Sequence, residues 1–171
     1  FICTGPFSCG DYANQTYLQS YSLSVRGGQG GINYFVSGAF SDAQALLPND
    51  HSTSYSTRAN LSFQPTEDLN VQWNTSFSNT QLQNTAQQNN AQGITLNAFR
   101  QERNYFGSGD PELLAVLLDQ EIDEDVSRLT TGATLTYTPI TDLTNRFVVG
   151  YDWTAREHRN LRPYGWEQVP E

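Results

Sequence analysis

Two histidines stand beside carboxylates and are the first residues to consider for chemistry. His51 follows Asp50, and His158 follows Glu157. A histidine next to a carboxylate can act as a general acid or base. Both pairs fall in expected loop or strand-end surroundings, where adjacent charged residues are common, so we interpret them as solvated surface groups. The sequence gives little support for an enzyme.

A run of carboxylates in the stretch DQEIDED offers oxygen ligands in number. Its acidic residues are Asp119, Glu121, Asp123, Glu124 and Asp125. Calcium is bound by such oxygens, but the calcium-loop pattern with its central glycine is absent. Two interpretations stay open, a calcium site in a surface loop and a solvated acidic patch. No other cofactor is expected.

Two cysteines, Cys3 and Cys9, lie close together in CTGPFSCG. This spacing allows a small disulfide loop, which would suit an exported protein. A metal site would need further ligands, and none is nearby.

The charged residues exclude several function classes. All nine basic residues are arginines, so there is no lysine for a P-loop, a Schiff base or a Ser-Lys dyad. The formal net charge of −9 repels phosphate backbones, so no nucleic acid partner is expected.

The elements that position these residues are predicted from strict apolar and polar alternation, which indicates strands with two different faces. The pattern predicts an all-β, antiparallel up-and-down meander of about six strands. We expect three hairpins at 20–41, 55–79 and 128–157, with loops at 1–19, 80–127 and 158–171.

An internal repeat supports this arrangement. LSFQPTEDL, which begins at Leu61, aligns without a gap with LTYTPITDL, which begins at Leu135, and both predict a strand, a turn and a strand. Short and long connections alternate, so all short turns are expected at one end of the sheet. Outer-membrane barrels show this asymmetry.

One short helix is expected inside the longest loop. Asp110 is a good N-cap and Pro111 suits the first helical position. The apolar residues that follow include Leu113, Leu114, Leu117 and Leu118.

The apolar face could meet lipid or a protein core. The opposite face carries Ser, Thr, Asn, Gln and Arg, which suits a hydrated lumen, and aromatic residues gather near strand ends, as at bilayer interfaces. Six strands cannot close such a barrel, so we expect a segment of a larger transmembrane β-barrel. The alternative is a soluble secreted β-sandwich that binds glycans or a surface partner.

Three motifs resemble SusC/RagA-type TonB-dependent outer-membrane receptors, whose barrels carry a Leu-Ser-Val-x-Gly-Gly turn, a Tyr-x-Val-Ser strand and an Arg-x-Asn-Leu strand. The matching residues are Leu23, Ser24, Val25, Gly27 and Gly28, then Tyr34, Val36 and Ser37, then Arg58, Asn60 and Leu61. The resemblance implies a bacterial outer-membrane receptor that imports a large nutrient, such as an oligosaccharide or peptide.

The resemblance also implies partners, namely TonB and a surface lipoprotein that closes the barrel as a lid. Arg58, Asn60 and Arg128 are expected to face the lumen, where the arginines pair with acidic groups of a plug domain or meet lumen water. Leu113, Leu114, Leu117 and Leu118 are expected to contact the lid or to pack on their own loops.

Overall fold

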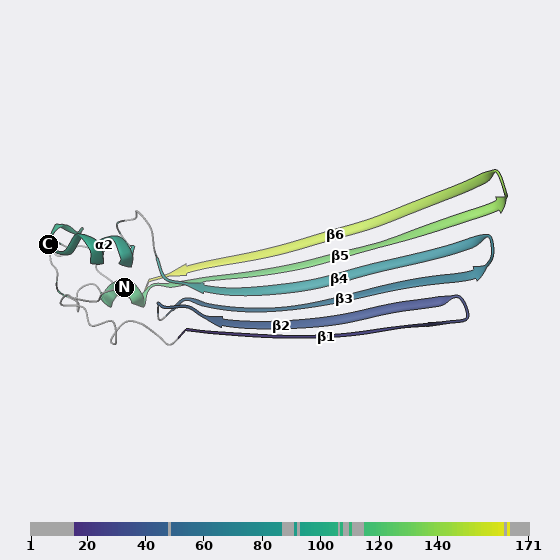
Figure 1. Ribbon diagram of the computed structural model, residues 1–171. Coiled ribbons are helices and arrows are strands. Elements are labelled where there is room, and N and C mark those ends of the chain that lie inside the picture. Colours follow the sequence, from purple (N-terminus) through teal and green to yellow (C-terminus); the bar gives the residue numbers. More distant parts are fainter. Residues whose placement is uncertain are drawn as a thin grey trace.

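A single antiparallel sheet dominates the computed structural model, which describes residues 16–47, 49–86, 91, 93–105, 107, 110, 115–162 and 164. Its six strands follow one another in chain order, each paired with the next (Figure 1). They are β1 (Tyr17–Gln29), β2 (Ile32–Gln44), β3 (His51–Thr66), β4 (Leu69–Asn84), β5 (Glu121–Ile140) and β6 (Leu143–Leu161). The predicted up-and-down meander is confirmed.

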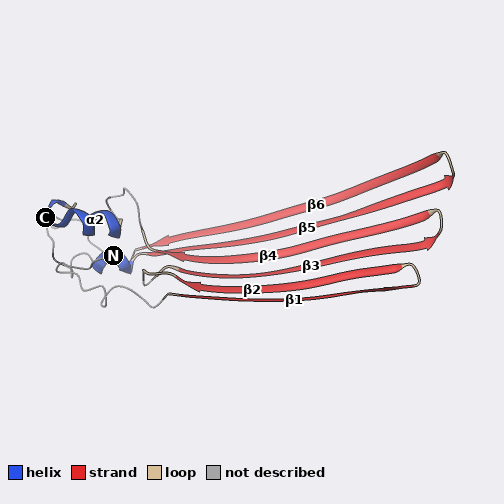
Figure 2. Cartoon of the chain, in the orientation of Figure 1, coloured by secondary structure: helices blue, strands red, loops and turns tan. Residues whose placement is uncertain are grey.

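The three short turns lie together at one end of the sheet, and the helices lie at the other (Figure 2). Each turn has two residues, and the three turns connect β1 to β2, β3 to β4, and β5 to β6. In the first turn, Gly30 and Gly31 adopt φ values of 61° and 84°, a backbone region that favours glycine. This explains why the chain reverses so tightly there.

The sequence repeat produces a repeated local structure. The register shifts between Phe63 and Thr66 on β3, and it shifts between the equivalent Tyr137 and Ile140 on β5. Just after each of Phe63 and Tyr137, a backbone N–H donates to a carbonyl in the preceding turn. The two bonds are Gln64 N to Gly31 O and Thr138 N to Asp68 O, both 2.8 Å. The repeat therefore encodes the same irregularity before the same kind of turn.

The register gathers the alternating residues on two distinct faces, because directly paired residues share a face. Leu61, for example, pairs with Tyr34 on one side and Trp73 on the other, and all three belong to the apolar set. Ser62 pairs with Asn33 and Gln72, which belong to the polar set. We call these the apolar face and the polar face.

The apolar face ends before the strands do. At the long-loop end, an aromatic row of Tyr21, Phe40 and Tyr55 crosses β1 to β3. The next row on the same face is polar and acidic, and it consists of Gln19, Asp42, Thr53, Gln81, Asp125 and Glu157. The strands thus continue beyond the apolar zone. The acidic run from Glu121 to Asp125, expected in a loop, lies on β5.

Little of the described chain is buried. Ala86 and Leu117 are the only buried hydrophobic residues in the described ranges, and most large apolar side chains of the strands are exposed. These residues form one sheet, with no second sheet against the apolar face. No helix in this part of the chain is long and apolar enough to cross a membrane.

The connection between β4 and β5 holds the helices. A short α-helix, α2 (Ile94–Arg100), is followed by the 3-10 turns η1 (Gln101–Arg103) and η2 (Val116–Asp119). The sequence predicted the helix of this connection later in the chain, beginning near Pro111. Residues 111–114, with Leu113 and Leu114, lie outside the described residues, as do Cys3 and Cys9, and η2 is the described part of that segment.

Leu117 is completely buried within the chain, and Leu118 is half-buried. Burial of Leu117 within its own chain favours packing in the loop, and contact of these leucines with a partner stays a prediction. Burying an apolar side chain within its own chain removes it from water, which is favourable without any partner.

Candidate functional site

The polar face carries the expected arginines on β3 and β5, with β4 between them. Arg58 and Asn60 on β3 and Arg128 on β5 all belong to it by register. Arg128 Nη2 donates to Asp152 Oδ2 on β6 at 2.7 Å, and Thr130 Oγ1 donates to the same oxygen at 3.1 Å. One expected arginine therefore finds its carboxylate within the sheet itself.

Arg58 differs from Arg128. Within the part of the chain that the structure describes, its guanidinium has no hydrogen bond or ion pair. It lines a hollow of about 460 Å³ on the polar face of β1 to β4, together with six serines and a few other residues, among them Leu23 and Phe77. Asn60 lies one row closer to the turns and pairs with Asn74.

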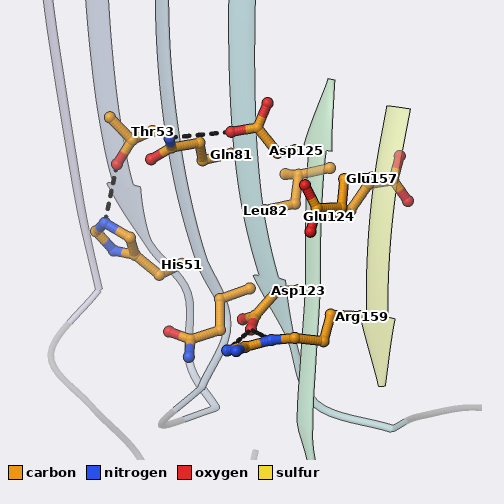
Figure 3. Close-up of a pocket in the computed structure, with 10 residues that line it drawn as sticks. His51, Thr53, Gln81, Leu82, Asp123, Glu124, Asp125, Glu157 and Arg159 are labelled. Atoms are coloured by element: carbon orange, nitrogen blue, oxygen red, sulfur yellow. Dashed lines mark hydrogen bonds and ion pairs between the residues drawn. The ribbon is translucent and has the colours of Figure 1, made fainter. Parts of the chain in front are cut away.

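A second hollow, of about 530 Å³, lies on the other face at the long-loop end (Figure 3). It is lined by residues of β3, β4, β5 and β6, all of them polar except Leu82. Gln81 Nε2 donates to Asp125 Oδ2 at 3.1 Å, and Arg159 Nη2 donates to Asp123 Oδ2 at 2.7 Å. These contacts cross-link neighbouring strands beyond the aromatic row.

The structure divides the acidic run instead of gathering it. Glu121, Asp123 and Asp125 point to one face of β5 and Glu124 to the other, because neighbouring strand residues alternate. Arg159 contacts Glu121 and Asp123, and Glu124 accepts a bond from Arg156 Nη2 at 2.7 Å. Asp119 ends η2. Among the described residues, no three His, Cys, Asp or Glu side chains are placed to hold a metal ion.

Asp42 is the centre of a polar network that the sequence did not suggest. Tyr17 Oη donates to Asp42 Oδ2 at 2.8 Å, and Thr53 Oγ1 donates to Asp42 Oδ1 at 3.0 Å. His51 Nε2 lies 3.1 Å from Asp42 Oδ1. The Tyr17 bond above all, then those of Thr53 and His51, hold the pKa of the Asp42 carboxyl below its ordinary value, against desolvation.

The histidines therefore do not pair with their sequence neighbours. His51 contacts Asp42, while Asp50 accepts the backbone N–H of Thr85 at 2.6 Å. His158 Nδ1 lies 3.9 Å from Glu124 Oε2. Each partner lies on an adjacent strand, so only the register could have revealed it.

Asn97 was also missed. It is fully buried on α2, its Nδ2 donates to the carbonyls of Ala91 and Gly93, and its Oδ1 accepts the N–H of Tyr105. Gly93 precedes the helix, in place of the Ser, Thr, Asp or Asn that usually signals a helix start. Asn97 therefore organises the loop without a local sequence signal.

Comparison with known proteins gives a likeness to a solved structure. The sequence matches no family model and no curated protein. A solved structure, that of the RagAB peptide importer in the "closed-closed" state, is similar with a TM-score of 0.72 and 18% sequence identity. The likeness covers 95% of this chain and 20% of that chain, so the chain spans about a fifth of its length. At this identity the likeness shows the fold, a six-stranded meander like a segment of that chain.

Proposed function

We propose that the chain forms part of the wall of a large outer-membrane β-barrel that imports a bulky nutrient, such as an oligosaccharide or a peptide. The apolar face meets lipid, and the polar face lines a water-filled lumen. Further strands flank β1 and β6, because unpaired backbone groups in lipid cost several kcal/mol each.

The observation that carries this proposal is an apolar face on which none of the described elements packs. On β3 this face runs from Tyr55 to Phe63, which matches the roughly 9 to 11 residues that a tilted strand needs to cross the hydrocarbon layer. Aromatic residues bound this zone, with Tyr55 at one end and Phe63 at the other, as in the interfacial belts of membrane barrels.

The soluble sandwich explains the structure less well. A sandwich buries its apolar face against a second sheet about 10 Å away. The described residues form one sheet, and its apolar side chains remain exposed. Lipid supplies the missing apolar surroundings without a second sheet.

The long-loop end is the extracellular end in this proposal, and the two-residue turns lie in the periplasm. By the sequence resemblance, TonB supplies the energy for import, and a surface lipoprotein covers the barrel from outside. The likeness to an importer composed of two named parts, RagAB, supports such a partner.

Import can be tested in cells that carry or lack the full-length receptor. Both strains are grown on a mixture of peptides and oligosaccharides, and mass spectrometry follows which solutes disappear from the medium. We expect the deletion strain to leave a set of large solutes behind. A protonophore should produce the same pattern in the parent strain, because energised import would stop. Identical depletion by both strains would contradict the proposal.

A further inference from the structure

The two faces of the sheet carry opposite charge. On β1 to β4 the polar face holds two guanidinium groups, Arg26 and Arg58, and no carboxylate at any position of its rows. On the other face, the zone beyond the aromatic row carries Asp42 and most of the acidic run. A chain with a formal net charge of −9 thus keeps four strands of one face free of negative charge.

Arg58 lies at the middle of this positive region. Ser37 and Ser76 are directly opposite it on the neighbouring strands. Ser22, Ser24, Ser56 and Ser78 complete the serines of its hollow. Small side chains leave room beside the guanidinium, and the volume of about 460 Å³ exceeds what a single ion fills.

The neighbouring arginines show what such a group does when a carboxylate is in reach. Arg128 binds Asp152 and Arg156 binds Glu124, both at 2.7 Å. Arg58 has the same chemistry, but the carboxylates on its face, Asp152 and Glu124, lie away from β3, on β6 and β5, and bind those two arginines. We propose that Arg58 and its serines form a subsite for a carboxylate group of the imported solute, which deepens the proposed function and rests on it.

The chemistry of the hollow selects the ligand class. A guanidinium holds a carboxylate through two parallel N–H bonds, and serine hydroxyls can donate to the remaining lone pairs or accept from hydroxyl and amide groups of the same solute. One guanidinium among neutral serines balances one negative charge. The solute is therefore a peptide with acidic side chains or an oligosaccharide with uronic acid units.

The test uses the purified full-length receptor and two matched pairs of probes. One pair is a glutamate-containing peptide and the same peptide with glutamine, and the other is a galacturonate and a galactose oligosaccharide of equal length. In at least one pair the acidic member should bind about tenfold more tightly, the gain expected of a charge-assisted bond. Arg58→Gln should abolish that preference, and Arg58→Lys should keep part of it.

Arg26→Gln is the matched control, because Arg26 shares the polar face and has no partner in the described residues, yet does not line the hollow. It should keep the preference. The inference is overturned if neither pair shows a preference in the wild type, or if the preference survives Arg58→Gln.

The alternative partner of Arg58 is a carboxylate of the receptor itself, outside the described residues. In that case Arg58→Gln, unlike Arg26→Gln, would lower the thermal midpoint of the receptor without any probe, and the acidic probes would gain nothing in the wild type. That result also overturns the inference. The proposed function is tested separately by the depletion of solutes by cells, an experiment that uses none of these probes. Its failure can therefore be distinguished from failure of the Arg58 inference.

Discussion

At the scale of single residues, the face that a side chain occupies decides what it does. Adjacent residues such as Leu61 and Ser62 meet opposite surroundings, since every step along a strand changes face. Arg128 and Arg58 share a face, yet only Arg128 has a carboxylate on an adjacent strand, the diagonally placed Asp152. The two arginines differ because of the residues on the strands beside them, and the identity of an arginine alone does not reveal those neighbours.

The contrast between Leu61 and Ser62 can be measured. Leu61→Arg should lower the free energy of unfolding of the full-length receptor in lipid vesicles by about 2 to 4 kcal/mol, because it places a charge in hydrocarbon. Ser62→Arg adds the same side chain on the lumen side and should change little. Urea titration of both variants checks this, and equal losses at the two positions would contradict the assignment of faces.

Asp42 gives a prediction for pH. Its pKa is lowered in the folded protein, so the network contributes stability above the ordinary pKa of the carboxyl and loses it as the pH falls through the lowered value. Tyr17→Phe removes the largest cause and should raise the pKa of Asp42 towards its ordinary value. Carbon-13 NMR titration of labelled aspartate in the receptor measures this shift.

Tyr21→Phe is the control for that titration, because the Tyr21 hydroxyl contacts the neutral Gln19 amide at 3.5 Å. It should leave Asp42 unchanged. An Asp42 pKa that does not respond to Tyr17→Phe would show that the hydrogen bond is not its cause.

At the scale of elements, the sequence was sufficient for the six strands, their order and their faces. Period-two alternation is strong where one face is apolar, as from Tyr55 to Phe63. Glycine marked the first turn, whereas Pro65 and Pro139, expected to start the other two turns, lie in the bulges just before them. The repeat beginning at Leu61 and Leu135 thus became a repeated bulge and turn. Each of these signals is local, and the structure agrees with it.

The loop ends of the strands could not be predicted in the same way. Beyond the aromatic row the formerly apolar face is polar and acidic, and leucines such as Leu18 and Leu82 fall on the other face. The alternation that marked the strands is therefore lost while backbone pairing continues. The Arg128–Asp152 and Asp42–His51 contacts join different strands. Helix α2 depends on the buried Asn97 rather than on a cap or an apolar stripe.

The first turn tests how an element depends on one glycine. A Cβ on Gly31 would lie 2.7 Å from the backbone oxygen of Gln64, whereas one on Gly30 meets nothing within 4 Å. Both residues have positive φ, so either alanine variant is strained, and Gly31→Ala also displaces the neighbouring hairpin. We expect losses of roughly 2 to 3 kcal/mol for Gly31→Ala and about 1 kcal/mol for Gly30→Ala.

Unfolding titrations of the two receptor variants provide the comparison. A larger loss of unfolding free energy for Gly30→Ala than for Gly31→Ala would contradict this expectation. It would show that the close contact between Gly31 and β3 does not determine which residue the turn tolerates.

The long connection depends on Leu117. Leu117→Ala should destabilise the loop by about 2 to 5 kcal/mol, because it leaves a cavity in one of its few buried apolar positions. Hydrogen exchange should rise in residues 93–105 and 115–120 and stay unchanged in β1 to β3. Leu118→Ala, at a half-buried site, should have a smaller effect. Unchanged loop exchange in Leu117→Ala would contradict the self-packing role.

At the scale of the whole molecule, the proposed function makes the sheet a wall between lipid and water. Within the described residues, its apolar face is uncovered, its polar face has arginines without a partner, and β1 and β6 are its open edges. A free-standing sheet of this kind would expose both its edges and its apolar face to water. Insertion into a larger barrel satisfies both, and the likeness to a fifth of a much longer chain agrees with this.

The most direct test of the wall is spin-label accessibility in the full-length receptor in lipid vesicles. Nitroxide labels are placed one at a time at Leu23 and Ser24, Val36 and Ser37, and Leu61 and Ser62, in a background with Cys3 and Cys9 replaced by serine. Labels at Leu23, Val36 and Leu61 should be relaxed by oxygen, which concentrates in lipid, and those at the serines by a water-soluble nickel complex. Nickel accessibility at all six positions, or oxygen accessibility at the serines, would contradict the account.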